Sequence, residues 1–341
     1  MSRLGRFAAR LALLSAVATA CGEDPLAPVT EPAPQIPDGL WAVSGSASAI
    51  LRLAPAQLTG SGDRVPDTRI TTPGDGLRPL ASLAFGPDGR LWISTADGSR
   101  VLAFAPAALG TSGLRAATTE ITPAGGSLSA PMGLAFDAAH GLWVANFSSG
   151  TLVRFSAAQL DAGGAIEPAV VISGAGQPAA LAFDANGSLW VADYQANRIL
   201  RYDAAQLAVT GSPAPAVLTA ADSSLRNPSG LAFDAAGNLW VSSLSSATVV
   251  AFSTGQLATP GSRIPRVVLS SDRGSLAFPA GLAFDADGSL WVLGGAGALT
   301  NFASTSLLAT GAPVPAARLQ ISGESLFWGV ALSPRAGLPL R

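Results

Sequence analysis

The chain is short of the residues on which many cross-links and active sites depend. Its 341 residues include one cysteine, Cys21, and one histidine, His140, and all 20 cationic residues are arginine because lysine is absent. A lone cysteine excludes an intramolecular disulfide. The arginines are scattered singly, whereas nucleic-acid binding needs a clustered basic face, so we expect no nucleic-acid partner. With 48% hydrophobic and 12% charged residues, the chain is predicted to fold around one or two sizeable cores.

The N-terminus has the pattern of an export signal. Three arginines precede LALLSAVATA, an apolar run too short for a permanent membrane-spanning helix. The run ends in Ala18-Thr19-Ala20-Cys21, which resembles a bacterial lipoprotein signal, although Ala18 stands where leucine is usual. The resemblance implies a signal peptide over residues 1–20 and a lipid on Cys21. The alternative is an ordinary secreted protein with a leftover thiol.

Residues 22–37 form a Pro-rich stretch that suits a tether between an anchor and a folded domain. We therefore expect an exported lipoprotein held at a membrane of the bacterial cell envelope, in the periplasm or at the outer membrane. Its first expected partner is the membrane itself, contacted through the lipid.

The rest of the chain is a repeat. Six strings of the form LW[AIV][ASVL] begin at positions 40, 91, 142, 189, 239 and 290, so they are spaced by 51, 51, 47, 50 and 51 residues. An apolar triplet, usually LAF, precedes five of them by a constant interval, and D-x-x-G or a close variant lies between triplet and string. Each unit predicts four short β-strands, such as GLAFD, SLWVAD, RILRYD and PAVVIS. SAAQL or DAAQL between the third and fourth strands predicts one helical turn with Ser or Asp as N-cap.

Four antiparallel strands repeated six times predict an all-β protein, a six-bladed β-propeller over residues 38–341. The chain enters this region on a second-strand string, DGLWAV, and ends on an orphan first strand, Gly329 to Ser333. The C-terminal strand can therefore complete the N-terminal blade and close the ring, which leaves no terminal sheet exposed. We expect this closed ring to be a monomer.

The motif LAFDANGSLWVADYQANRILRYD at residues 181–203 is similar to the NHL repeat. More loosely, residues 38–341 resemble the six-bladed propellers grouped with gluconolactonase and regucalcin, and the streptogramin lyases. The resemblance implies the fold but not the activity, since such propellers include enzymes and binding platforms alike.

Two features of those enzymes are missing here. The metal-dependent hydrolases hold a divalent cation with Glu, Asp and Asn at the starts of inner strands, whereas the corresponding segments here, such as PMG, PAA and PSG, carry neither carboxylate nor amide. The lyases use histidine, but His140 lies in a predicted hairpin turn, DAAHGLW, on the face opposite the loops between blades. We therefore predict no metal, no cofactor and no catalytic residue.

Polar residues near the predicted mouth of the ring are the remaining candidates. The aspartates of the D-x-x-G turns recur at the same turn of four repeats, which indicates a structural role. Side chains that differ from blade to blade are better candidates for ligand binding, although Asp193 and Arg198 match NHL positions that more often stabilise the blade. The candidates are Asp193, Tyr194, Asn197, Arg198, Asn146, Arg100 and Trp328.

Tryptophan invites a stacking role, but six of the seven are predicted to fill the space between blades. Trp328, in SGESLFWGV, stands instead at the entry of the closing strand, where it could bind a ligand or plug the channel. We expect a non-catalytic binding or scaffolding module for a protein or a small ligand. The alternative is a hydrolase or lyase of the gluconolactonase or streptogramin lyase kind.

Overall fold

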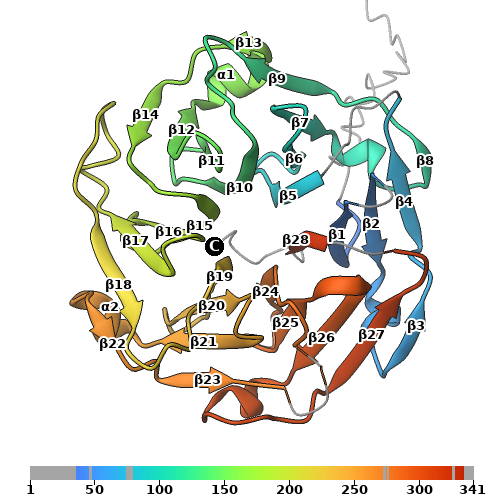
Figure 1. Cartoon of the computed structure of the whole chain (residues 1–341). Helices are drawn as coiled ribbons and strands as arrows, with labels where there is room; N and C mark the ends of the chain where they lie inside the picture. Colours follow the sequence, from blue (N-terminus) through green and yellow to red (C-terminus); the bar gives the residue numbers. More distant parts are fainter. Residues whose placement is uncertain are drawn as a thin grey trace, which may run out of the picture. The chain divides into compact units, whose positions relative to one another are not determined.

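The computed structural model describes residues 36–45, 48–73, 80–271, 274, 276–324 and 327–333. The predicted signal peptide, Cys21 and residues 22–35 of the predicted tether lie outside the described residues. The strands form six separate sheets arranged in a ring around one axis, a six-bladed β-propeller (Figure 1). The predicted fold is therefore confirmed.

Each blade contains four antiparallel strands, which run outward from the axis in sequence order in blades 2 to 6, whereas the C-terminal strand is innermost in blade 1. The innermost strands of blades 1 to 6 are β28 (Phe327–Leu332), β5 (Leu80–Phe85), β10 (Pro131–Phe136), β15 (Pro178–Phe183), β19 (Pro228–Phe233) and β24 (Leu282–Phe284). The second strands are β1 (Leu40–Ser44), β6 (Leu91–Thr95), β11 (Leu142–Asn146), β16 (Leu189–Asp193), β20 (Leu239–Ser243) and β25 (Leu290–Leu293).

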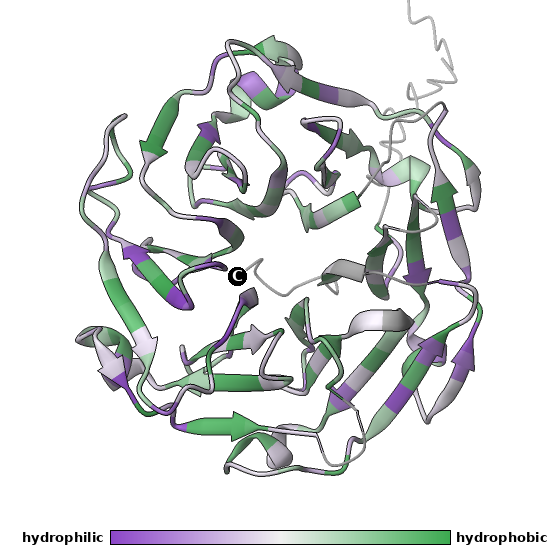
Figure 2. Ribbon diagram, viewed as in Figure 1, coloured by the Kyte–Doolittle hydropathy of each residue, from purple (hydrophilic) through white to green (hydrophobic). Residues whose placement is uncertain are grey.

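The outer half of each blade is built in the same way. The third strands are β2 (Ala49–Leu53), β7 (Arg100–Phe104), β12 (Thr151–Phe155), β17 (Arg198–Tyr202), β21 (Thr248–Phe252) and β26 (Ala298–Phe302). The fourth strands are β4 (Thr68–Thr71), β9 (Thr119–Pro123), β14 (Val170–Ser173), β18 (Ala216–Ala220), β23 (Val267–Leu269) and β27 (Ala317–Ile321). Figure 2 shows hydrophobic residues along much of the length of these strands, as buried sheet faces require.

The C-terminal strand closes the ring, as the sequence predicts. β28 pairs antiparallel with β1, with Leu332 opposite Leu40 and Val330 opposite Ala42. The Ser333 side chain extends the closure, because its Oγ accepts a 2.8 Å hydrogen bond from the Gly39 N–H. The first blade is thus built from both ends of the propeller region.

Tryptophan side chains fill the space between blades, which confirms their predicted role. The six that head the second strands are 0–4% exposed. Five of them meet the phenylalanine of the next blade's LAF triplet edge to face, with ring centroids 5.9–6.4 Å apart; the pairs are Trp41–Phe85, Trp92–Phe136, Trp143–Phe183, Trp190–Phe233 and Trp240–Phe284. Each such pair contributes about 0.5–1.5 kcal/mol beyond the burial of its area.

A fifth, parallel segment on the outer edge of each blade is not predicted by the sequence. After the third strand of one blade, the chain reaches back and pairs with the fourth strand of the preceding blade. Four of these segments form short strands, β3 (Gly62–Arg64), β8 (Gly113–Leu114), β13 (Gly164–Ile166) and β22 (Ser262–Arg263), and two form single bridges at Gly211 and Gly311. The segments link neighbouring blades around the circumference and cover the edges of the fourth strands.

The predicted helical turn after the third strand is confirmed in part. In α1 (Ala157–Ala162) and α2 (Thr254–Ala258), Ser156 and Ser253 cap the helix with their side chains. Blades 1, 2 and 6 have 3₁₀ turns instead, η1 (Pro55–Leu58), η2 (Pro106–Ala108) and η4 (Ser304–Leu307), and another, η3 (Gly295–Gly297), lies in the loop before β26. The prediction is wrong for DAAQL, where the Asp203 carboxylate forms an ion pair with Arg201 at 3.0 Å and no helix forms.

Candidate functional site at the mouth of the propeller

The loops between second and third strands share one face of the ring with the loops that enter the blades. In three blades, the first residue of the loop between second and third strands donates a backbone hydrogen bond of 3.0–3.2 Å to a carbonyl of the entering loop. The bonds are Phe147 to Ala130, Tyr194 to Gln177 and Leu244 to Asn227. We call this face the mouth.

Asp193 is buried beneath the mouth. Its side chain is 1% exposed; Oδ1 accepts a 3.0 Å hydrogen bond from the Gln177 N–H and Oδ2 accepts one of 2.8 Å from Arg198 Nε. Gly176 packs directly against the carboxylate, because a Cβ at this position would lie within 2.4 Å of it. The carboxylate therefore fixes the loop that enters blade 4.

Asn146 occupies the same position in blade 3 and is 0% exposed. Its Oδ1 accepts from the Ser129 N–H at 3.1 Å, and its Nδ2 donates to Ser127 O at 2.9 Å and to Thr151 Oγ1 at 3.0 Å. A buried polar residue at the end of the second strand thus holds the entering loop in blades 3 and 4.

Ser44 ends the second strand of blade 1. Like Asn146 and Asp193, it is a buried polar residue that bonds to an entering loop, here the loop that joins blade 6 to blade 1. Its Oγ donates a hydrogen bond to Glu324, whose other oxygen accepts from Arg69 on β4. Glu324 is 9% exposed and lies three residues after the end of β27, the last strand of blade 6. The sequence contains no pattern that signals this ion pair, because the three residues are far apart in the chain.

The other predicted site residues have different surroundings. Asn197 has a left-handed backbone (φ +55°), and its Oδ1 accepts a 2.8 Å bond from the Asn227 N–H. Asn227 also donates to the Tyr194 carbonyl at 3.1 Å, so the structure brings these residues together across two blades. Arg100 instead pairs with Glu120 at 3.0 Å within blade 2. Trp328 lies in β28, and its side chain is outside the described part of the chain.

Large apolar side chains line one side of the mouth. Phe147, Tyr194 and Leu244 begin the loops of blades 3, 4 and 5, and all three are half-buried. The rings of Phe147 and Tyr194 meet edge to face at 5.8 Å. In blades 1, 2 and 6 the equivalent residues are small, namely Gly45, Ala96 and Gly295.

Blade 6 places its aromatic residue on the entering loop instead. Phe278 is 64% exposed and has a left-handed backbone, φ +50°, an uncommon conformation for a bulky residue. The Gly295 N–H donates to the Phe278 carbonyl at 3.2 Å, and a Cβ at Gly295 would lie 3.2 Å from the Phe278 Cβ. We call Phe147, Tyr194, Leu244 and Phe278 the apolar sector. Among them, only Tyr194 is predicted from the sequence; the signal for Phe147, Tyr194 and Leu244 is that one loop position is large in blades 3 to 5 and small in blades 1, 2 and 6.

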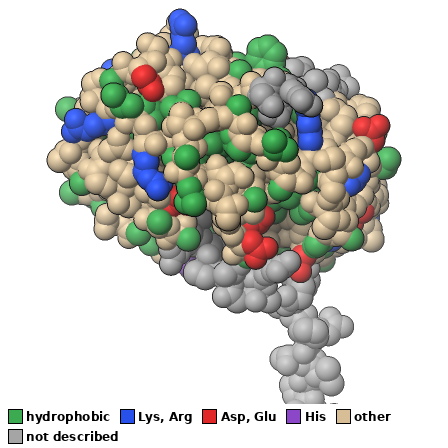
Figure 3. All heavy atoms as spheres, turned by 90° about the horizontal axis from the view of Figure 1, so that it is seen from below, with side chains coloured by type: hydrophobic (Ala, Val, Ile, Leu, Met, Phe, Trp, Pro, Cys, Tyr) green, Lys and Arg blue, Asp and Glu red, His purple; other side chains and the backbone are tan. Residues whose placement is uncertain are grey.

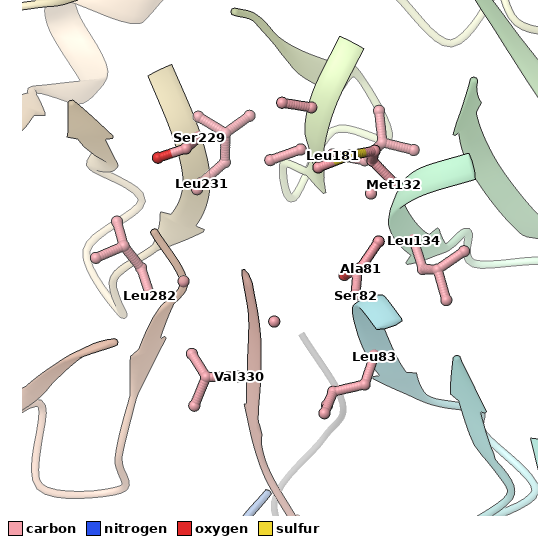
Figure 4. Close-up of a pocket in the computed structure, with 16 residues that line it drawn as sticks. Ala81, Ser82, Leu83, Met132, Leu134, Leu181, Ser229, Leu231, Leu282 and Val330 are labelled. Atoms are coloured by element: carbon pink, nitrogen blue, oxygen red, sulfur yellow. The ribbon is translucent and has the colours of Figure 1, made fainter. Parts of the chain in front are cut away.

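The axis contains a narrow cavity of about 100 Å³. Its described lining carries neither carboxylate nor carboxamide side chains, and a ring of aliphatic side chains narrows it (Figure 4). The ring consists of Leu83, Leu134, Leu181, Leu231, Leu282 and Val330. Small residues near these positions reflect crowding, since a Cβ at Gly133 would lie 2.8 Å from the Ala180 Cα, and one at Gly329 would lie 2.7 Å from the Ser82 Cα.

The repeated aspartates hold the hairpins on the face opposite the mouth, as the sequence indicates. In blade 3, Asp137 Oδ1 accepts from the N–H groups of Ala139 and Gly141, and Oδ2 accepts from Trp143 Nε1 and Arg154 Nε. Burial opposes ionisation of Asp137, but these bonds outweigh it and lower its pKa below 3.8. His140 lies exposed in the same turn with φ +62°.

The described residues contain no group of three or more His, Cys, Asp or Glu that could hold a metal ion. Over the same part of the chain, no helix combines the length and the apolar character needed to cross a membrane.

Solved structures similar to this chain are also propeller proteins. Virginiamycin B lyase from Staphylococcus aureus is 15% identical, with a TM-score of 0.55 and 79% of each chain covered. A catalytically inactive histidine-to-alanine variant of that enzyme with quinupristin is 13% identical, with a TM-score of 0.56, covering 87% of this chain and 93% of the other. A streptogramin B lyase is 14% identical, with a TM-score of 0.58, covering 89% and 92%.

These similarities show the fold alone, because all identities are low. No protein-family model matches the sequence, and none of the curated proteins compared with it is similar.

Proposed function

We propose that this protein is a non-catalytic binding module that takes its ligand, a small molecule or a segment of a protein, at the mouth of the propeller. The observation that carries the proposal is the apolar sector. Apolar side chains gather on one side of the mouth, and three of them, Phe147, Tyr194 and Leu244, stand at a loop position that carries glycine or alanine in the other three blades. Loops on a rigid ring are a common location for binding sites, and half-exposed aromatic rings are common anchors in them.

Catalysis is not part of the proposal because the polar side chains beneath the mouth already have structural partners. Asp193, Asn146 and Glu324 are buried and hydrogen-bonded, so none is free to transfer a proton to a ligand. The inactive variant among the similar structures lacks a histidine. The single histidine here, His140, is exposed on the opposite face.

The test is native mass spectrometry of the protein extracted gently from its own envelope. We expect a bound species in the wild-type protein that is lost from a Tyr194→Ala/Leu244→Ala variant and retained in a rim variant, Val314→Ala. Val314 is 80% exposed. Equal retention of the species by both variants would contradict binding at the mouth.

We further propose that the chain is exported as a monomer and anchored by a lipid on Cys21, with the Pro-rich residues 22–37 as tether. The support is the sequence pattern at the N-terminus. A Cys21→Ser variant should then leave the membrane fraction on cell fractionation. Its persistence in the membrane pellet would contradict the anchor.

A second candidate, a hydrolase or lyase, is favoured by the streptogramin B and virginiamycin B lyases among the similar structures. The two candidates differ in turnover. If purified protein opened a lactone or a streptogramin ring, and a chelator abolished that activity, the binding proposal would be wrong.

A further inference from the structure

The mouth combines its apolar sector with an arginine that has no acidic partner among the described residues. Arg226 lies in the loop that enters blade 5 and is exposed. Within the described residues, no carboxylate lies at ion-pair distance from its guanidinium. The neighbouring Arg198, by contrast, is paired with Asp193 through Nε, and its side chain is still 36% exposed.

The backbone holds Arg226 beside the apolar sector. The Arg226 N–H donates to Ser243 Oγ at 2.6 Å, and the Arg226 carbonyl accepts from the Ser245 N–H at 3.2 Å. Leu244, a member of the apolar sector, lies between these two serines. The backbone of Arg226 is therefore fixed next to Leu244.

The same loop is bonded to the aromatic pair of the sector. Asn227, the next residue, donates to the Tyr194 carbonyl at 3.1 Å, and Tyr194 contacts Phe147 edge to face. One continuous run of contacts thus joins the loops that carry two aromatic rings, an aliphatic side chain and the cation of Arg226. The axial cavity has no such combination in the described residues. The cavity lining is uncharged, and in the view of Figure 3 hydrophobic side chains on the rim are scattered among polar ones.

We propose that the mouth of blades 3 to 5 binds small aromatic anions, with the ring against Phe147 and Tyr194 and the anionic group at Arg226. The inference rests on the proposed binding function and names its ligand class. An exposed guanidinium pairs with a carboxylate through charge-assisted hydrogen bonds. Aromatic side chains bind a planar ring through area burial and edge-to-face contact. A ligand that contacts both the guanidinium and the aromatic pair therefore needs an anionic group and an aromatic ring.

The phenylalanine of blade 6 adds a third wall. Its side chain packs against Gly295 in the loop of blade 6, where a Cβ would lie 3.2–3.6 Å from Phe278 Cβ, Cδ2 and Cγ, so we place this wall on the blade 6 side of the apolar sector. Holding this side chain in a left-handed backbone costs about 1 kcal/mol or more. Replacement by glycine should remove that cost and also remove the wall.

Fluorescence or NMR titration with 2-naphthoate, 2-naphthamide and cyclohexanecarboxylate tests the inference. We expect 2-naphthoate to bind more tightly than either of the other two, because each lacks one of the required features. Arg226→Gln should weaken 2-naphthoate binding roughly three- to tenfold and leave 2-naphthamide unchanged. Tyr194→Ala should weaken both aromatic compounds. Arg266→Gln, at an exposed arginine just before β23, is the matched control and should change neither.

Phe278→Gly separates a binding role from a structural one. We expect a higher melting temperature together with weaker 2-naphthoate binding, a combination that a purely structural residue would not give. If 2-naphthoate and 2-naphthamide bound equally and Arg226→Gln had no effect, the anion specificity would be overturned while binding at the mouth remained. If 2-naphthoate did not bind while an envelope ligand was retained by native mass spectrometry, the ligand class would be wrong and the proposed function would stand.

Discussion

Trp190 Nε1 donates a 2.9 Å hydrogen bond to Oδ2 of Asp184, six residues earlier in the chain. The other oxygen of Asp184 accepts from the N–H groups of Asn186 and Ser188, which closes the hairpin. The same arrangement recurs in blades 3, 5 and 6, with Nε1 to Oδ2 distances of 2.9–3.1 Å. One carboxylate thus fixes both the turn and the tryptophan that packs against the next blade.

Asp184→Asn should destabilise the protein. The amide can replace one acceptor but not both, so the buried Trp190 N–H or the turn loses its partner, at a cost of about 2 kcal/mol. Urea denaturation followed by tryptophan fluorescence measures the loss. The control is Asp203→Asn, at a carboxylate that is 58% exposed, for which we expect a change below about 0.5 kcal/mol. An equally small change at both positions would contradict the role of Asp184.

Stability should fall in acid partly through Asp137. The pKa of this carboxyl is lowered in the folded state, so the folded protein releases its proton more readily than the unfolded chain does. The stabilisation is therefore present above about pH 4 and lost as the pH falls further. Between pH 6 and pH 3, Asp137→Asn should lose less free energy of unfolding than the wild-type protein. A parallel fall of both curves would exclude this contribution.

Tyr202→Phe should stabilise the protein. The Tyr202 hydroxyl is buried, with no hydrogen-bond partner among the described residues, and phenylalanine stands at this position in blades 2, 3, 5 and 6. Removing an unsatisfied buried hydroxyl should gain about 1 kcal/mol. Burial also raises the pKa of Tyr202 to about 12, so the variant should lose the tyrosine absorbance step near that pH. A destabilised variant would indicate that the hydroxyl does have a partner.

Ser306→Gln should add a pair of side-chain-to-backbone hydrogen bonds that a glutamine makes in four other blades. In blade 4, Gln206 Oε1 accepts from the Asp203 N–H, and Nε2 donates to the Ala214 carbonyl, both at 2.8 Å. Gln57, Gln159 and Gln256 make the equivalent pairs of bonds.

The Ser306 N–H already donates to Ala303 at 2.8 Å, which is the turn that the glutamines use. We expect a gain of about 1 kcal/mol from Ser306→Gln and a similar loss from Gln206→Ala, measured by urea denaturation. A neutral result for both would show that the glutamines contribute nothing to holding the outer segments.

The fold could be predicted because its signals are local and repeated. The LW strings, the LAF triplets and the D-x-x-G turns predict strand length and pairing order within each unit of about 50 residues. The orphan strand at residues 329–333 predicts the closure of the ring. The parallel outer segments were missed because they pair across blades through strands of only two or three residues, which are too short to carry a hydrophobic alternation.

The site was harder to predict than the fold. Asp193 and Asn146 look like binding residues in the sequence because they vary among repeats. The structure shows both buried and holding their own entering loops. Phe147, Leu244 and Phe278 look like ordinary apolar residues, and only their position at the mouth sets them apart. Burial is the missing information, since a sequence does not say which face of a loop meets solvent.

The central claim is that ligands bind at the mouth, and NMR mapping tests it most directly. Intermolecular nuclear Overhauser contacts should be recorded between 2-naphthoate and selectively labelled protein. We expect contacts to side-chain protons of Phe147, Tyr194 and Leu244. We expect none to Val65, Ile264 or Val314, which are 69–80% exposed near the outer segments. Contacts on the outer segments or in the axial cavity, with none at the mouth, would contradict this claim.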